Sequence, residues 1–345
     1  MNELDTRALL GRMAAEPAPP TRTDIDGAIA TARRQRQRTR WVVAAAAATV
    51  LILTVGLVTI LRPEPQDPAP TATPPAVAPT KFDPTRTRLD VGWLPEGMRY
   101  RARSITADVE SLLAAPSASS AGVNIQLTAK GFVPTAESEN VPGVPIGEPV
   151  LGPEVNGAPS RWYPGDAQGG GWLHWEWAPG ALAVVEVYGR TDARDVATRI
   201  ARSVRADRER PVALPFTMAR PDGTTVVTVG IVENGSGPYT TWLEFARARS
   251  DVSMLSVMVL PRRSVTFTPD TVLGARPADE QQTGVWYSIR VELADDVLLE
   301  VKDRAASTSA SAVDPVRAQV RAVAAGVQLS GDLSDPSTWS KEPLR

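Results

Sequence analysis

The chain has 345 residues, enough for two domains of ordinary size, and its 43% hydrophobic and 22% charged residues are typical of a folded protein. Its net charge of −2 does not indicate nucleic acid as a partner, and the absence of cysteine excludes a disulfide framework, a cysteine nucleophile and a thiolate metal site. Because His174 is the one histidine, a metal site built from several histidines is excluded as well.

Residues 1–40 are too few to bury a sizeable core of their own. A helix is predicted to start at Thr23, and it would carry Ile25, Ile29 and Ala32 along one face. Two interpretations are open. The segment is either a stub that sets membrane topology, or a docking peptide whose apolar stripe binds a cytoplasmic partner protein.

An uncharged run of 21 residues, from Trp41 to Leu61, follows this segment. As a helix it would be roughly 31 Å long, which matches the hydrocarbon thickness of a bilayer. Five arginines lie between residues 33 and 40, whereas Arg62 is the nearest one on the other side. The positive-inside rule therefore predicts a single-pass protein in the lipid bilayer, with an N-terminal cytoplasmic segment and residues 62–345 outside the cytoplasm.

The segment from Arg7 to Trp41 resembles the start of actinobacterial single-span membrane proteins, some of which are associated with alternative sigma factors. The resemblance implies a sigma-type factor as the cytoplasmic partner of residues 1–40. The zinc-binding module usual in anti-sigma proteins carries a His-x-x-x-Cys-x-x-Cys motif, and neither residue type occurs before Trp41.

Residues 62–81 form a proline-rich linker, with seven prolines between Pro63 and Pro79. Such a composition favours extended polyproline II, which at about 3.1 Å per residue would span up to roughly 55 Å. The segment is therefore predicted to be a semi-rigid spacer.

An internal repeat is predicted beyond the linker. Residues 172–187 align without a gap with residues 286–301, 114 positions later (286 minus 172). We predict an α+β fold of two repeated modules, each an antiparallel sheet with a C-terminal helix packed on it. Their boundaries are 82–207 and 208–330, and a C-terminal tail covers 331–345.

Apolar and polar residues alternate along both modules, which indicates strands with one buried face. One helix is predicted from Asp192 to Arg205, with Val196 and Ile200 facing the sheet. A second is predicted from Asp314, with Pro315 in its first turn, to a stop at Gly326. The predicted strands are 98–105, 122–132, 159–164, 171–178 and 181–188, then 224–233, 239–248, 253–260, 285–293 and 297–303.

The first module resembles a domain found outside the membrane in bacterial regulatory proteins, including some anti-sigma-like ones. The resemblance rests on the entry Leu94-Pro95-Glu96-Gly97, on the tryptophan-containing hairpin 172–187 and on the helix from Asp192 to Arg205. It implies an extracytoplasmic sensing or interaction domain, and it implies no catalytic residues.

No motif in the sequence indicates catalysis. His174 is predicted in mid-strand, whereas catalytic residues lie more often on loops and strand ends, and no metal-ligand spacing surrounds it. The glycine run 169–171 precedes a strand instead of opening a helix, so we interpret it as a flexible turn and not as a phosphate-binding loop.

A cluster of aromatic residues is the one candidate binding surface in the sequence. Aromatic faces can bind cell-wall glycans, but alternation places Trp175 and Trp177 in the core, so core packing is favoured. Trp172 and Trp286 are expected on the polar face of their strands. The cluster consists of Trp162, Tyr163, Trp172, Trp175 and Trp177.

The sequence as a whole predicts a non-enzymatic, single-pass membrane protein with an extracytoplasmic sensing or binding domain that regulates a cytoplasmic, sigma-type factor. The alternative is a membrane-anchored protein that binds cell-wall glycans. Neither hypothesis includes catalytic, cofactor-binding or metal-binding residues, a cofactor, or nucleic acid. The expected partners are the bilayer, a cytoplasmic protein bound to residues 1–40, and a cell-wall or protein ligand outside.

Overall fold

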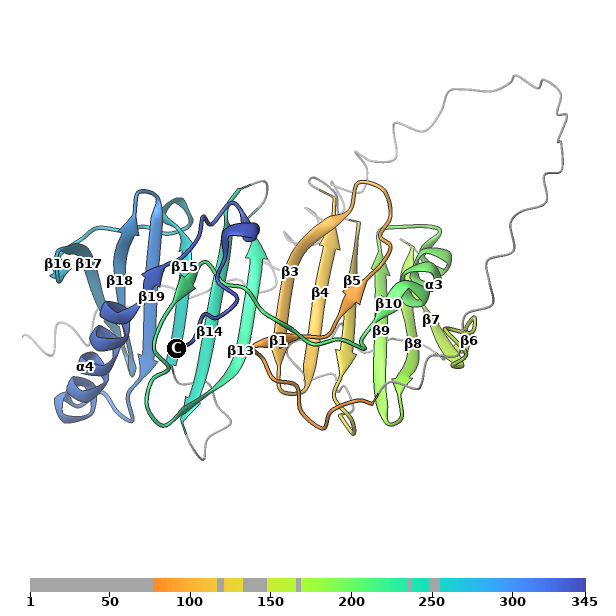
Figure 1. Ribbon diagram of the computed structural model, residues 1–345, viewed down its shortest axis with the longest axis horizontal. Coiled ribbons are helices and arrows are strands. Elements are labelled where there is room, and N and C mark those ends of the chain that lie inside the picture. Colours follow the sequence, from red (N-terminus) through yellow and green to blue (C-terminus); the bar gives the residue numbers. More distant parts are fainter. Residues whose placement is uncertain (1–76, 117–120, 133–147, 166–168, 235–236, 248–254) are drawn as a thin grey trace, which may run out of the picture. The chain divides into compact units, whose positions relative to one another are not determined.

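The computed structural model describes residues 77–116, 121–132, 148–165, 169–234, 237–247 and 255–345 (Figure 1). The predicted cytoplasmic segment 1–40 and the predicted span 41–61 lie outside these residues, as does the linker before residue 77. The end of the linker is described. Ala78 packs against Ala178 and Ala181, and the Pro79 carbonyl accepts a hydrogen bond of 2.8 Å from the Lys130 amide.

Fourteen strands form one antiparallel sheet, in the order β16-β17-β18-β19-β15-β14-β13-β3-β4-β5-β9-β8-β7-β6 (Figure 1). Most of them carry β-branched and other apolar residues at alternate positions, which suits a sheet with one buried face. The strands are β3 (Arg99–Thr106), β4 (Val109–Ala115), β5 (Gly122–Thr128), β6 (Val150–Leu151), β7 (Ser160–Pro164), β8 (Gly170–Ala178), β9 (Ala181–Tyr188), β13 (Thr224–Glu233), β14 (Tyr239–Arg247), β15 (Leu255–Pro261), β16 (Thr271–Leu273), β17 (Arg276–Thr283), β18 (Trp286–Ala294) and β19 (Val297–Arg304).

The predicted fold class is wrong. The described chain is mostly β, with two α-helices, and the strands of both predicted modules belong to one sheet instead of two. They join because β3 pairs antiparallel with β13, with Arg103 opposite Ile231. The strand order runs outward from this junction in the same way on both sides. The boundaries 82–207 and 208–330 stay a prediction.

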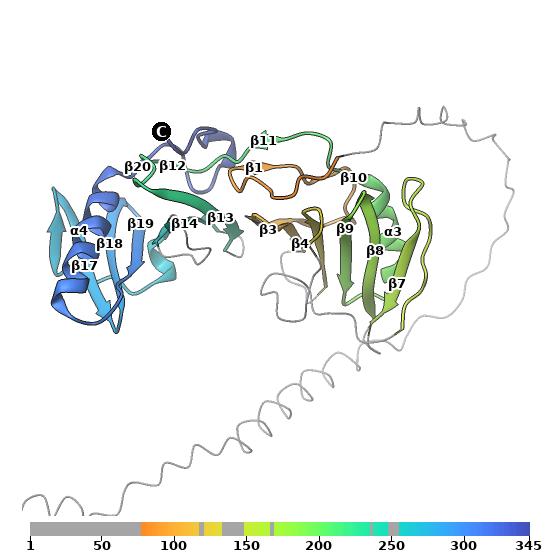
Figure 2. The same ribbon diagram turned by 90° about the horizontal axis from the view of Figure 1, so that it is seen from below.

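Three short two-stranded ladders accompany the sheet. Figure 2 shows them on one side of β13 and β3. They pair β1 with β11, β2 with β10 and β12 with β20, and the described residues also form two short 3-10 helices. These elements are β1 (Arg86–Thr87), β2 (Asp90–Val91), β10 (Val204–Arg205), β11 (Arg210–Pro211), β12 (Phe216–Thr217), β20 (Gln328–Leu329), η1 (Arg262–Ser264) and η2 (Pro336–Thr338).

Helix α3 (Ala193–Ser203) packs against β8 and β9 and buries Val196 and Ile200, as their spacing predicts. Helix α4 (Ala310–Gly326) packs against β18 and β19 and ends at Gly326. Its predicted start is wrong, because the helix begins four residues before Asp314 and contains Pro315. Burial of Val313 against the sheet stabilises this additional turn.

The main hydrophobic cluster of the described residues continues from one end of the sheet to the other. It includes Leu173 of β8, Ile289 of β18 and Phe216 of β12, all of them fully buried. The helices and the short ladders therefore cover the same face of the sheet.

Both edges of the sheet are short strands with exposed apolar side chains, Leu151 of β6 at 82% and Val272 of β16 at 60% exposure. In each case a helix arginine donates to a carbonyl group of the edge strand. Arg194 bonds the carbonyl of Leu151 at 2.9 Å, and Arg321 bonds that of Val272 at 3.4 Å. Shortness and these contacts protect the edges against pairing with other chains.

Within the described ranges, neither helix is both long and apolar enough to cross a lipid bilayer. This finding contradicts the prediction of a single-pass membrane protein with an extracytoplasmic C-terminal part. The predicted span itself, residues 41–61, falls outside those ranges.

Candidate functional site

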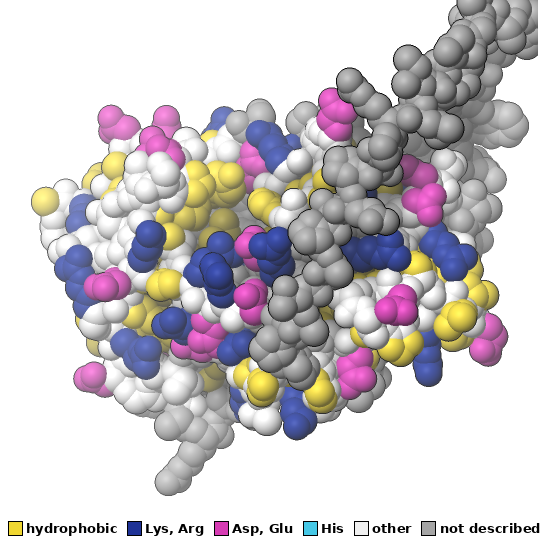
Figure 3. Space-filling model, turned by 45° about the vertical axis from the view of Figure 1, so that its right-hand side comes forward, with side chains coloured by type: hydrophobic (Ala, Val, Ile, Leu, Met, Phe, Trp, Pro, Cys, Tyr) yellow, Lys and Arg dark blue, Asp and Glu magenta, His cyan; other side chains and the backbone are white. Residues whose placement is uncertain are grey.

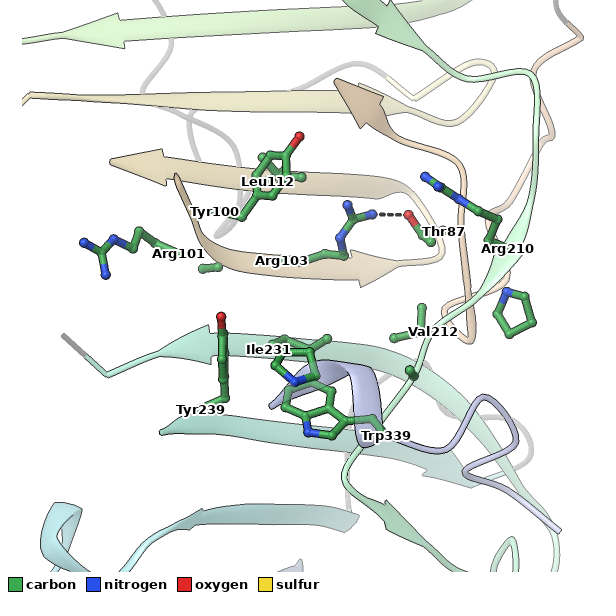
Figure 4. Close-up of a pocket in the computed structure, with 14 residues that line it drawn as sticks. Thr87, Tyr100, Arg101, Arg103, Leu112, Arg210, Val212, Ile231, Tyr239 and Trp339 are labelled. Atoms are coloured by element: carbon green, nitrogen blue, oxygen red, sulfur yellow. Dashed lines mark hydrogen bonds between the residues drawn. The ribbon is translucent and has the colours of Figure 1, made fainter. Parts of the chain in front are cut away.

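A cavity of about 380 Å³ lies over the junction of β3 and β13 (Figure 4). This volume is within the usual range for small-molecule sites. Its walls come from β3, β4, β13 and β14 and from three segments that cross over them. The lining residues are Thr87, Tyr100, Arg101, Ala102, Arg103, Leu112, Arg210, Pro211, Val212, Ala213, Ile231, Tyr239, Pro336 and Trp339.

A bulge in β3 determines which of its side chains reach the cavity. The pairing with β4 shifts between Tyr100 and Ala102, so that Tyr100 lies opposite Ala114 and Arg103 lies opposite Leu112. Ala114 and Leu112 both belong to the core face. The bulge therefore brings Tyr100 and Arg103, three residues apart, to the same face, where regular alternation would separate them.

The crossing segments are held over the cavity by backbone hydrogen bonds. The Val212 amide donates to the Thr85 carbonyl at 2.9 Å, which joins the segment after β11 to the one before β1. Leu214 and Ser340 exchange two bonds of 2.9 Å each, which fixes the C-terminal segment beside them. The cavity is thus lined by parts of the chain that are far apart in sequence.

Aromatic side chains form one end of the cavity. The rings of Tyr239 and Trp339 meet edge to face, with centroids 5.4 Å apart, and the Trp339 indole donates to the Asp332 carbonyl at 2.6 Å. Tyr100 does not belong to this pair and lies nearer to Arg103 (Figure 4), with its hydroxyl donating to the Val91 carbonyl at 3.1 Å. Burial, with a smaller contribution from the charge of Asp90, raises the pKa of Tyr100 above its ordinary value, so this side chain is a neutral donor.

Buried ion pairs support the opposite end. Glu110 is fully buried and lies 2.7 Å from a guanidinium nitrogen of Arg103. The same carboxylate accepts hydrogen bonds from the backbone amides of Arg88 and Leu89, at 2.8 and 3.1 Å, and from the Thr87 hydroxyl. Glu110 thereby joins the strand that carries it to the segment that crosses above.

Two further pairs involve arginines that line the cavity. Arg101 lies 2.7 Å from Glu233, and both side chains are nearly buried. Arg210 lies 3.4 Å from Asp90, and each of these two side chains is 53% exposed. On the part of the surface in Figure 3 that the described residues form, basic and acidic side chains are interspersed instead of gathering into a patch of one sign.

The predicted aromatic cluster is divided between the two faces of the sheet. Trp162 and Trp175 are buried in the core, as favoured for Trp175. Trp177 is half-buried, because the register shifts between Glu176 and Ala178, and its indole donates to the Thr128 carbonyl at 3.2 Å. On the opposite face of β7 and β8, the rings of Tyr163 and His174 lie 4.7 Å apart.

Trp172 and Trp286 also lie on the polar face of their strands, as predicted, and both are half-buried. The Trp286 ring has the Lys302 ammonium 4.5 Å from its centroid. Neither these two residues nor the other four of the aromatic cluster line the cavity.

The buried position of His174 predicts a specific pH dependence of the protein's stability. Burial, with a smaller effect of Arg161, lowers the pKa of His174 to about 4. Between about pH 4 and the unfolded value of about 6.5 the unfolded chain binds more protons, so stability falls as the pH is lowered through this window. We expect urea unfolding to show a loss of roughly 2 kcal/mol from this group between about pH 7 and 4.5, absent in His174→Gln. Equal pH dependence in both proteins would contradict the burial of His174.

The residues that enclose the cavity were missed by reasoning from the sequence. Tyr100, Tyr239 and Trp339 lie in three separate regions, and Trp339 belongs to the segment predicted as a tail, so no motif connects them. One signal was present. Arg99, Arg101 and Arg103 alternate along a predicted half-buried strand, which indicates buried ion pairs near that strand.

The walls of the cavity present aromatic and aliphatic surface together with guanidinium donors. Among the described residues, no group of three or more histidine, aspartate or glutamate side chains is arranged to hold a metal ion. No protein-family model and no curated protein sequence matches this chain.

Proposed function

We propose that the described part of this chain is a binding domain and that its ligand site is the cavity over the β3–β13 junction. The observation that carries the proposal is the cavity itself, about 380 Å³ in volume and walled by Tyr100, Tyr239 and Trp339. Small-molecule sites are typically concave and largely apolar, with a few polar groups that orient the ligand.

The lining residues support binding over catalysis. Among the described residues that line the cavity there is no carboxylate, histidine, lysine or serine. Arg103 and Arg101 are engaged by Glu110 and Glu233, which fixes their positions. Side chains held in this way are preorganised for recognition.

Two parts of the functional hypothesis depend on residues or ligands beyond the cavity. A sigma-type factor bound to residues 1–40 stays a prediction, because that segment lies outside the described residues. Binding of a glycan by the aromatic cluster has less support than the cavity, because Trp162 and Trp175 are buried in the core.

The proposal predicts that filling the cavity abolishes binding. Ala213 lines the cavity from a crossing segment, so Ala213→Trp would place an indole inside it. We expect calorimetric titration of the full-length chain to detect binding of 1-naphthoate or of its neutral analogue 1-naphthamide, and Ala213→Trp to weaken that binding at least about tenfold. The substituted chain should unfold at a temperature close to that of the parent.

Ala219→Trp is the matched control, because Ala219 is exposed on the same segment and does not line the cavity. It should leave binding unchanged. The proposal is overturned if the parent chain binds neither probe, or if Ala213→Trp binds them as tightly as the parent does.

A further inference from the structure

We infer that the cavity takes a ligand with a flat apolar body and one negatively charged group, of the chemical class of an aromatic monocarboxylate, with the carboxylate lying between Arg103 and Arg210. This inference rests on the proposed function, since it specifies what the same cavity binds.

The two ends of the cavity differ in chemistry. Figure 4 shows Arg103, Thr87 and Arg210 together at one end, and Tyr239 and Trp339 at the other. A ligand that contacts both ends therefore needs an apolar part that packs against rings and a polar part that accepts hydrogen bonds. Guanidinium groups donate only, so the polar part is an acceptor.

The charged side chains that line the cavity are all basic. Arg101, Arg103 and Arg210 line it, and no carboxylate is among its described lining residues. Their ion-pair partners Glu233, Glu110 and Asp90 are not lining residues. A basic lining favours an anionic ligand over a neutral or cationic one.

Arg103 and Arg210 have complementary roles at the charged end. Arg103 is held by Glu110, by the Thr87 hydroxyl and by the Leu89 carbonyl at 3.3 Å, so its guanidinium plane is fixed. Arg210 is half-exposed, and its distance of 3.4 Å from Asp90 is longer than a normal charge-assisted hydrogen bond. Arg210 can therefore turn toward a carboxylate without breaking a short ion pair.

The size of the cavity suits a small aromatic ligand. A volume of about 380 Å³, near the lower end of the range for small-molecule sites, accommodates a body of one or two fused rings. The edge-to-face pair of Tyr239 and Trp339 presents aromatic surface, which favours a flat ring.

The test compares 1-naphthoate with 1-naphthamide, which have the same ring system but differ in charge. Titration calorimetry on the full-length chain should show that naphthoate binds at least about tenfold more tightly. Arg210→Gln should remove most of this preference by weakening naphthoate binding about tenfold, while naphthamide binding stays the same. Arg208→Gln is the matched control, because Arg208 is exposed and does not line the cavity, and it should leave both affinities unchanged.

The outcomes show whether the inference fails alone or together with the proposed function. Equal affinities for the two probes, both abolished by Ala213→Trp, would overturn the preference for an anion and leave the binding site in place. If Arg210→Gln weakens naphthoate binding no more than Arg208→Gln does, Arg210 does not bind the carboxylate. Failure of both probes to bind the parent chain would overturn the proposed function together with the inference.

Discussion

Replacing Ile200 with Asp is expected to lower the melting temperature far enough that much of the protein is unfolded at room temperature. Ile200 is fully buried in the middle of α3, within the cluster that also contains Leu173 and Trp175 of β8. An aspartate there would be charged and surrounded by apolar side chains. Burying such a charge without a partner costs several kcal/mol, which is comparable to the whole stability of a typical domain, about 5–15 kcal/mol.

The measurement is a thermal melt of the full-length chain followed by circular dichroism. Thr198→Asp introduces the same side chain two residues earlier, where the position is half-exposed, and should cost no more than about 1 kcal/mol. If Ile200→Asp melts at the temperature of the Thr198→Asp chain, α3 is not packed on the sheet as described.

Most strands rich in apolar residues could be predicted from the sequence, although β4 (Val109–Ala115) was not. The predicted strand 224–233 coincides with β13 (Thr224–Glu233), which is rich in β-branched valine, threonine and isoleucine. Strand β17 (Arg276–Thr283) was missed, because Ala278 is its one buried apolar residue. It is a strand because both of its neighbours, β16 and β18, pair with it. Such tertiary pairing leaves no trace in the local pattern.

The glycine run 169–171 shows a second limit of the sequence. It was interpreted as a flexible turn, whereas Gly170 and Gly171 belong to β8 and their φ angles are 148° and 153°. A Cβ atom on Gly171 would lie 2.6 Å from the carbonyl oxygen of Tyr163, and one on Gly169 would lie 2.6 Å from that of Arg190. These glycines are needed for close approach of the backbone, which depends on partners distant in sequence.

The candidate site could not be predicted because it arises from the junction of two strands that no local signal connects. Internal similarity between residues 172–187 and 286–301 relates strands far from this junction, and it does not reveal that β3 pairs with β13. The bulge that turns Tyr100 toward the cavity has no sequence signature either. What the sequence did contain was the row of arginines on β3, and the structure pairs Arg103 of that row with Glu110.

Replacing Glu110 with Ala is expected to destabilise the protein by about 3–5 kcal/mol, because it removes one partner of a buried ion pair and leaves the other uncompensated. Glu110 is fully buried, and Arg103 is largely buried beside it. The substitution also leaves the amides of Arg88 and Leu89 without their acceptor. Because these amides attach the segment with Thr87 to the sheet, the charged end of the cavity should lose its shape at the same time.

Urea unfolding at constant pH measures this cost. Glu292→Ala is the matched control, since Glu292 lies at the same 2.7 Å from Arg262 but in a pair whose arginine is 41% exposed, and surface pairs contribute about 0–1 kcal/mol. The double substitution Glu110→Leu with Arg103→Met should recover much of the stability, because it removes both charges together. It should not recover the preference for naphthoate over naphthamide, because Arg103 is one of the two groups proposed to bind the carboxylate. A loss in Glu110→Ala no larger than that in Glu292→Ala would show that the buried carboxylate does not fasten the crossing segment to the sheet.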